Sequence, residues 1–188
     1  MGIAASSKVD EQFFSAYLAA NHLEVQGRAR AEFAKYVASK PVPLALSADG
    51  VANVTLSLLG DSPKKDQNYS ISIATDRDAY VYCYLQDEND KIARVFPNRF
   101  VSSALVKAGG AMQLPGQQPF GLVANSKGVL ETFACFAAPA DVTPNLGPAV
   151  WGVDLEPLPV AGFDAIGEAF AKAGQGKVGL GVLDVKVK

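Results

Sequence analysis

The chain has 188 residues, of which 49% are hydrophobic and 19% charged, with a formal net charge of −2. This composition is typical of a chain that folds around a core, and the length suits one domain with appendages. No cluster of lysine and arginine favours nucleic acid or anionic lipid as a partner, and no apolar run is long enough to span a membrane.

Residues 1–43 are predicted to form an N-terminal helical segment. Apolar or small side chains recur near the helical period over Phe14–Tyr36, after an N-cap candidate at Asp10, and Pro41 ends the pattern. The first residues lack the basic and apolar regions of a complete signal peptide. They match the short myristoylation pattern at Gly2, but we favour the interpretation that a targeting segment has been trimmed from the native start.

From residue 51 the hydrophobic period changes to the two-residue alternation of β-strands. Glycine, proline and asparagine separate the apolar runs, and the acidic cluster Asp87–Asp90 indicates a hairpin loop. These features predict an antiparallel β-sandwich core over residues 44–140. The predicted strands cover residues 54–58, 69–73, 79–85, 92–96, 111–114, 120–124 and 129–137.

Residues 141–188 are predicted to complete the same domain. The stretch 138–160 is rich in proline around Trp151, which predicts an ordered connection without a regular element. A short helix is expected over 163–172 and a final strand over 178–187. The alternation in that strand shifts by one residue after Val182, which predicts a β-bulge.

Cys83 and Cys135 are the two cysteines of the chain, and each lies in a predicted strand. Buried free thiols in adjacent strands are the favoured interpretation. The alternative is a disulfide that staples the sheets, which would imply an oxidising compartment.

Several patterns resemble catalytic or metal-binding motifs but lack the required geometry. Gly174–Gly179 matches the glycine pattern of dinucleotide-binding loops. Such a loop must follow a strand and precede a helix, whereas this stretch follows a predicted helix and precedes a predicted strand. His22 is the one histidine, and with two distant cysteines it provides no zinc site of the usual spacing. An enzyme would need carboxylates such as Asp76 and Asp87 in one cleft, and the turn Asp87–Asp90 lacks calcium-loop spacing. We therefore expect no cofactor, no metal and no catalytic residue.

Tyr80, Tyr82 and Tyr84 lie on one face of the predicted strand 79–85. An exposed row of flat amphipathic rings can bind sugars or proline-rich peptides. The favoured interpretation is that a helix covers this row, and an exposed binding face is the alternative.

One stretch of the chain carries a set of motifs that occur together in a known family. They are Asp76-Arg-Asp-Ala-Tyr-Val-Tyr, Arg94-Val-Phe-Pro-Asn98, Leu114-Pro115 and Gly128-Val-Leu-Glu-Thr-Phe-Ala. Over roughly residues 51–140 the chain resembles the bacterial family DUF4384, a domain of unknown function. The resemblance implies an immunoglobulin-like sandwich in exported or envelope proteins, often beside peptidase, kinase or curli-assembly-like domains, and it supplies no catalytic residues. Pro97 is expected to end a strand, and Asn98 to form an Asx turn.

The sequence therefore predicts a mainly β, immunoglobulin-like antiparallel sandwich with an N-terminal helix and a C-terminal helix–strand extension. The leading hypothesis is a non-catalytic module that binds a protein partner in a bacterial envelope or secretion system. Its expected location is the periplasm, the envelope or the exterior, with the cytoplasm as the alternative. A carbohydrate- or peptidoglycan-binding module is the second hypothesis, and an enzyme ranks last. The candidate binding surface joins the aromatic strand face to neighbouring loops and consists of Tyr80, Tyr82, Tyr84, Phe96, Asn98 and Trp151.

Overall fold

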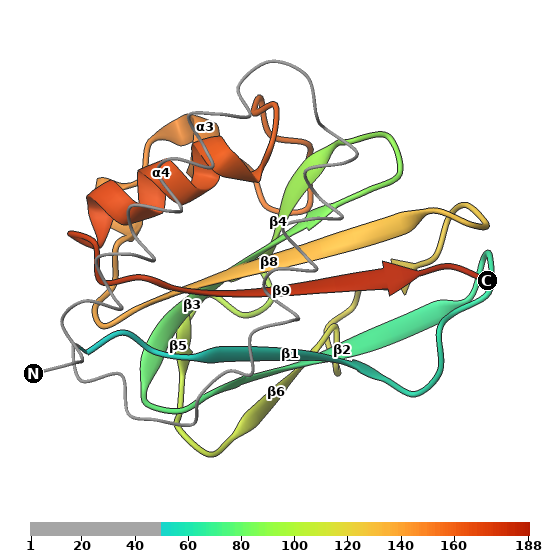
Figure 1. Ribbon diagram of the computed structural model, residues 1–188, viewed down its shortest axis with the longest axis horizontal. Helices are drawn as coiled ribbons and strands as arrows, with labels where there is room; N and C mark the ends of the chain where they lie inside the picture. The colour runs from blue at the N-terminus through green and yellow to red at the C-terminus, as the bar shows by residue number, and fades with distance from the viewer. Residues whose placement is uncertain (1–49) are drawn as a thin grey trace, which may run out of the picture. The chain divides into compact units, whose positions relative to one another are not determined.

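Two antiparallel sheets pack face to face in the computed structural model, which describes residues 50–188 (Figure 1). The predicted N-terminal helical segment lies outside the described residues. The first sheet contains β1 (Val54–Leu59), β2 (Asn68–Thr75), β6 (Ala111–Leu114) and β7 (Leu122–Val123), in the order β1-β2-β6 with β7 also paired to β2. The second contains β3 (Ala79–Gln86), β4 (Ile92–Phe96), β5 (Leu105–Val106), β8 (Leu130–Ala138) and β9 (Gly179–Lys186), in the order β4-β3-β8-β9 with β5 also paired to β3. The predicted mainly β, antiparallel sandwich is confirmed.

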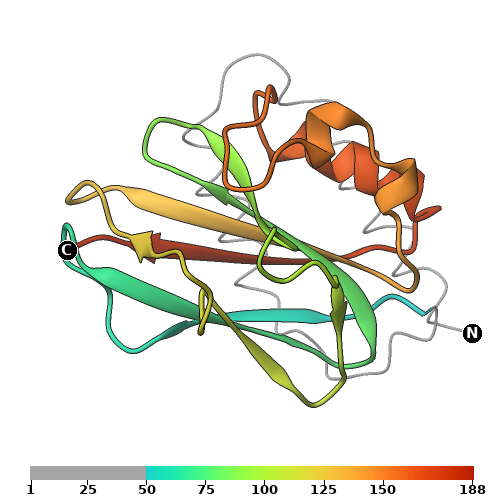
Figure 2. The same ribbon diagram turned by 180° about the vertical axis from the view of Figure 1, so that it is seen from behind.

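The second sheet is buried on both faces. Val81 and Cys83 of β3 contribute to the core between the two sheets. Tyr82 and Tyr84 of the same strand contribute to a second core, under the helices α3 (Pro148–Trp151) and α4 (Phe163–Ala173). Figures 1 and 2 both show these helices on the side of the second sheet opposite to β1 and β2. Because both faces are covered, β3 and β8 are apolar along almost their whole length.

The proline-rich stretch contains short regular elements, which corrects the expectation of a connection without any. A 3-10 helix spans Thr143–Asn145, and α3 follows it. Each has proline at its first or second position, where the missing N–H removes no hydrogen bond of the helix. None of the helices among residues 50–188 is long and apolar enough to cross a membrane.

The predicted bulge in the last strand is wrong. β8 and β9 keep one register from Leu130↔Lys186 to Ala137↔Gly179. Leu180 packs toward the helices, whereas Leu183 and Val185 pack toward the first sheet. Apolar residues on both faces therefore produce the apparent shift in alternation. A register shift does occur between β3 and β4, at Cys83 and Tyr84.

Cys83 and Cys135 face each other on β3 and β8 and form a disulfide. The free-thiol interpretation is wrong, and the alternative needs one correction: the bond joins neighbouring strands of one sheet, not the two sheets. Both residues are 0% exposed in the core between the sheets. The disulfide therefore fixes the central strand pair where no reductant reaches it in the folded protein.

We expect the double variant Cys83→Ala, Cys135→Ala to lose about 3–4 kcal/mol of unfolding free energy, because the bond closes a long loop of the unfolded chain. The two cysteines are 52 positions apart in the sequence. Guanidinium unfolding of the oxidised protein and the variant measures this difference. An unchanged midpoint with an unchanged slope would contradict it. As a control, thiol reagents should react with the native protein only after reductant and denaturant are both added.

Candidate functional site

The aromatic row of β3 lies beneath α4. Tyr82 and Tyr84 are 0% exposed, and the Phe170 ring of α4 lies 5.1 and 6.0 Å from their ring centroids. Phe136 of β8 stacks on Phe170 at 4.7 Å. Tyr80, at the start of the strand, is half-buried. Helix cover therefore removes Tyr82 and Tyr84 from the surface, and the candidate binding surface must be corrected at these two positions.

The hydroxyl of Tyr82 anchors the start of the proline-rich segment. It donates to Asp141 Oδ1 at 2.7 Å and accepts from the N–H of Val142 at 3.0 Å. Burial, together with the hydrogen bond to Asp141, raises the pKa of Tyr82 to about 12. The hydroxyl therefore stays protonated near neutral pH and serves as a structural donor.

Arg94 of β4 is a buried cation that binds the proline-rich stretch at Trp151 and Gly152. Its guanidinium lies 3.9 Å from the centroid of the half-buried Trp151 ring. Nε donates to the Trp151 carbonyl at 2.8 Å and Nη2 to the Gly152 carbonyl at 3.2 Å, and Nη1 donates to the Pro97 carbonyl. Burial lowers the pKa of Arg94. Backbone oxygens and an aromatic face compensate the buried charge, so the position of Trp151 depends on Arg94.

Asn98 organises the loop after β4. Its Oδ1 accepts from the N–H groups of Phe100 and Val101 at 2.9 and 3.0 Å, which confirms the predicted Asx turn. Its Nδ2 donates to the Val95 carbonyl at 2.8 Å and to Gln118 Oε1 at 2.7 Å. Asn98 is only 4% exposed. The side chain therefore ties this loop both to its own strand and to the loop between β6 and β7.

Arg99 connects the same loop to a third one. Its backbone N–H and Nε donate to Asp154 Oδ2 at 2.9 and 3.0 Å, and its Nη2 donates to the Asp154 carbonyl at 3.1 Å. Three loops are thus joined by side chains, and we call residues 97–101, 115–121 and 152–156 the loop cluster.

The loop cluster exposes apolar side chains. Phe100 is 43% exposed and stacks on Phe120, with ring centroids 6.2 Å apart and planes 16° apart. Val153 is 54% exposed on the third loop. Ordered loops that present an aromatic ring are common sites of protein recognition.

The predicted surface residues thus separate into buried supports and partly exposed positions. Phe96 and Asn98 are 1% and 4% exposed, whereas Tyr80 and Trp151 are half-buried. Phe100 was not among the predicted surface residues, although an apolar residue two positions after the Phe-Pro-Asn motif was a usable signal. The candidate binding surface therefore lies on the exposed loops and no longer on the strand face.

The other patterns have structural roles. Asp76 accepts hydrogen bonds from the backbone N–H and the Nδ2 of Asn53. Asp87 Oδ1 accepts from the N–H groups of Asn89 and Lys91 within its own turn. Gly174 ends α4. Over residues 50–188 no three His, Cys, Asp or Glu side chains gather in a way that suits a metal ion.

A family model described as a domain of unknown function, DUF4384, matches residues 64–141. The predicted resemblance is therefore confirmed over this part of the chain, which runs from the loop after β1 to just beyond β8. Residues of the first two loops of the loop cluster lie within the match, whereas α3, α4 and β9 lie beyond it. No curated protein and no solved structure matches the chain.

Asn98→Ala is expected to reduce the unfolding free energy by about 2–3 kcal/mol, because it leaves buried backbone groups without partners. Asn89→Ala is the matched control, since Asn89 is exposed in the hairpin turn. Urea unfolding compares the two variants with the wild type. Equal stability of both variants would show that Asn98 does not hold the loops.

Proposed function

We propose that this protein is a non-catalytic module that binds a protein partner in a bacterial envelope or secretion assembly, with the loop cluster as its binding surface. The observation that carries the proposal is the Phe100 ring, held in place on loops that Asn98 and Arg99 join. A surface that is ordered before binding loses little conformational entropy when a partner docks.

The chemistry of this surface favours a protein over a glycan. The tyrosine row, which offered hydroxyl groups to a sugar, lies under α4. The exposed side chains of the loop cluster include Phe100 and Val153, which have no hydrogen-bonding group. A partly exposed aromatic anchor with an ion pair beside it resembles the centre and rim of a protein interface.

The disulfide supports the proposed compartment. Disulfides persist in periplasmic and extracellular proteins and are rare in the reducing cytosol. The Cys83–Cys135 bond lies in the centre of the second sheet. A location in the bacterial envelope or outside the cell is consistent with this bond.

The test is a pull-down with tagged full-length protein from envelope extract of its source organism, with bound protein and bound glycan both quantified. Phe100→Ala is expected to reduce retention of the partner roughly tenfold or more, because aromatic anchors contribute most of the binding energy. Leu130→Ala is the control, since Leu130 is also an exposed apolar residue, at 45% against 43% for Phe100.

The proposal is overturned if the Phe100 variant, folded by circular dichroism, retains the same partner at the wild-type yield. Glycan retained without protein would favour the carbohydrate-binding hypothesis instead.

A further inference from the structure

A cavity lies at one end of the sandwich, where the loop between β1 and β2 meets the residues after β9. Its volume of about 410 Å³ is within the usual range of small-molecule sites. None of its lining residues belongs to the loop cluster, so the cavity is a separate feature of the molecule. The lining residues that bear on its chemistry are Asp61, Ser62, Lys64, Gln67, Tyr69 and Lys188.

Backbone hydrogen bonds hold the loop that forms the cavity on both of its sides. The Lys188 N–H donates to the Pro63 carbonyl at 2.8 Å, which ties the loop to the chain after β9. The Asp66 N–H donates to the Ala124 carbonyl at 2.7 Å, and the Ala124 N–H donates to the Gln67 carbonyl at 3.1 Å. Because the loop is already tied, a ligand does not have to order it on binding.

Tyr69 of β2 contributes an aromatic ring to the wall of the cavity. It is 7% exposed, and its ring packs edge-on against Phe133, with ring centroids 6.2 Å apart. Its hydroxyl donates to Oε2 of the buried Glu131 at 2.5 Å. The hydroxyl proton is therefore used within the core, and the polar contacts of a ligand must come from the loop and from Lys188.

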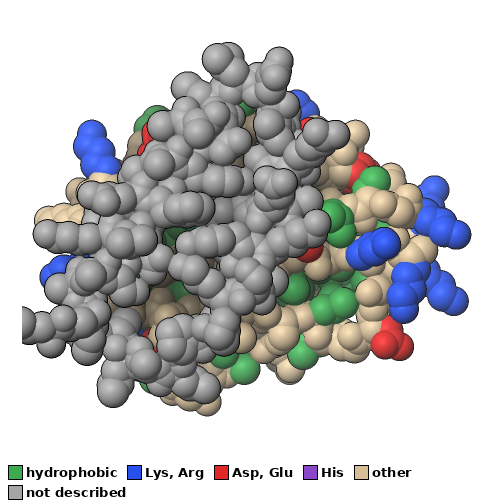
Figure 3. Space-filling model, viewed as in Figure 1, with side chains coloured by type: hydrophobic (Ala, Val, Ile, Leu, Met, Phe, Trp, Pro, Cys, Tyr) green, Lys and Arg blue, Asp and Glu red, His purple; other side chains and the backbone are tan. Residues whose placement is uncertain are grey.

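Two lysines line the cavity without an anionic partner. Lys64 and Lys188 are both exposed, and neither forms an ion pair with another residue of the range 50–188. Because Lys188 bonds to the carbonyl of Pro63, the residue before Lys64, the two lysine side chains start from neighbouring backbone positions. Figure 3 shows cationic side chains gathered at this end of the molecule. Two ammonium groups on one cavity favour an anionic group between them.

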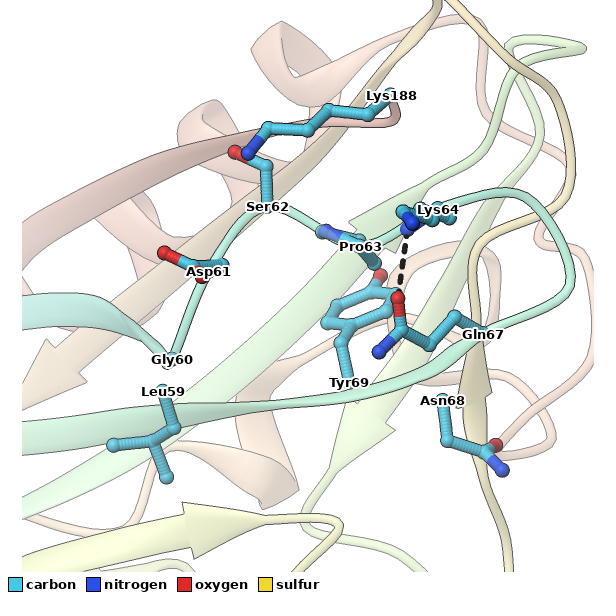
Figure 4. A pocket seen from close by; sticks show the side chains of 10 residues that line it. All are labelled: Leu59, Gly60, Asp61, Ser62, Pro63, Lys64, Gln67, Asn68, Tyr69 and Lys188. Carbon is cyan, nitrogen blue, oxygen red and sulfur yellow. Dashed lines mark hydrogen bonds between the residues drawn. The ribbon is translucent and has the colours of Figure 1, made fainter.

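The other polar side chains of the cavity suit the hydroxyl groups of a ligand. Asp61 is exposed, and its carboxylate is an acceptor with no ion pair in the described part of the chain. Gln67 Oε1 accepts from the Lys64 N–H at 2.9 Å, which leaves the NH₂ group of Gln67 as a donor. Ser62 adds a hydroxyl. Figure 4 shows these side chains around the cavity, whereas that of Asn68 points away from them.

We propose that the cavity binds an acidic sugar, a ring with several hydroxyl groups and one carboxylate, as in a uronic acid. The carboxylate lies between the ammonium groups of Lys64 and Lys188. One ring hydroxyl donates to Asp61, and others bond to Ser62 and Gln67. A neutral sugar leaves both lysines without an anion. A simple anion leaves Asp61 without a donor and brings a like charge toward it. The lining therefore favours a ligand that carries both kinds of group.

Titration of the full-length, ¹⁵N-labelled protein with sodium galacturonate, followed by two-dimensional NMR, tests the proposal. The amide signals of Ser62, Lys64 and Gln67 should shift and saturate at millimolar concentration, while those of the loop cluster stay in place. Galactose and acetate are the matched probes, because each carries one half of the proposed chemistry. Both should bind roughly tenfold more weakly than galacturonate, or weaker still.

A trimer of galacturonate separates two sources of this chemistry. Tighter binding of the trimer than of the monomer would assign the site to an acidic polysaccharide. Equal binding would assign it to the free sugar acid.

Two variants separate the roles of the charges. The double variant Lys64→Gln, Lys188→Gln should bind galacturonate roughly tenfold more weakly, because two charge-assisted contacts are lost. Lys177→Gln is the control, since Lys177 is exposed but does not line the cavity. Asp61→Asn should reduce the preference for galacturonate over acetate, because it removes both the acceptor and the like charge.

The proposal is overturned if galacturonate causes no saturable shifts, or if galactose or acetate binds as tightly. It is also overturned if the double lysine variant binds galacturonate like the wild type. The Phe100 pull-down is unaffected by any of these results, because the cavity and the loop cluster share no residue.

Discussion

Burial of the central strands β3 and β8 on both faces is the constraint on which the rest of the structure depends. One face packs against the first sheet and the other against α4, and the Cys83–Cys135 bond joins the two strands between these covers. Apolar and aromatic side chains can then occupy consecutive positions without reaching solvent. The tyrosine row thus belongs to the core, and the exposed apolar side chains Phe100 and Val153 lie on the loops.

The loops next to this core are ordered because buried polar groups need them. Arg94 is 5% exposed, and carbonyls of neighbouring loops satisfy its guanidinium. Asn98 is satisfied by Val95 and Gln118 in the same way. Movement of these loops would leave buried donors unpaired, at a cost of about 1–3 kcal/mol each. The Arg-Val-Phe-Pro-Asn motif therefore anchors these loops and fixes the position of Phe100.

Local patterns predicted most of the sandwich, and long-range contacts explain what they missed. Two-residue alternation located the longer strands, and the Asx turn at Asn98 depends only on the next few residues. β5 spans just Leu105–Val106, too short to show a period. Alternation placed the tyrosines on one face, and the favoured interpretation that a helix covers them is confirmed, but the pattern did not show that the helix is α4. The exposure of Phe100 depends on Phe120 and Asp154, both distant in sequence.

Nitration of the native protein with tetranitromethane, followed by peptide mass spectrometry, tests the two-sided burial of the second sheet most directly. If both faces of this sheet are buried, Tyr82 and Tyr84 stay unmodified in the folded protein and react once it is unfolded in urea, with the half-buried Tyr80 as the internal comparison. Nitration of Tyr82 and Tyr84 in the folded protein at the rate seen in urea would contradict it. The tyrosine row would then be an open surface, and the binding site would return to the strand face.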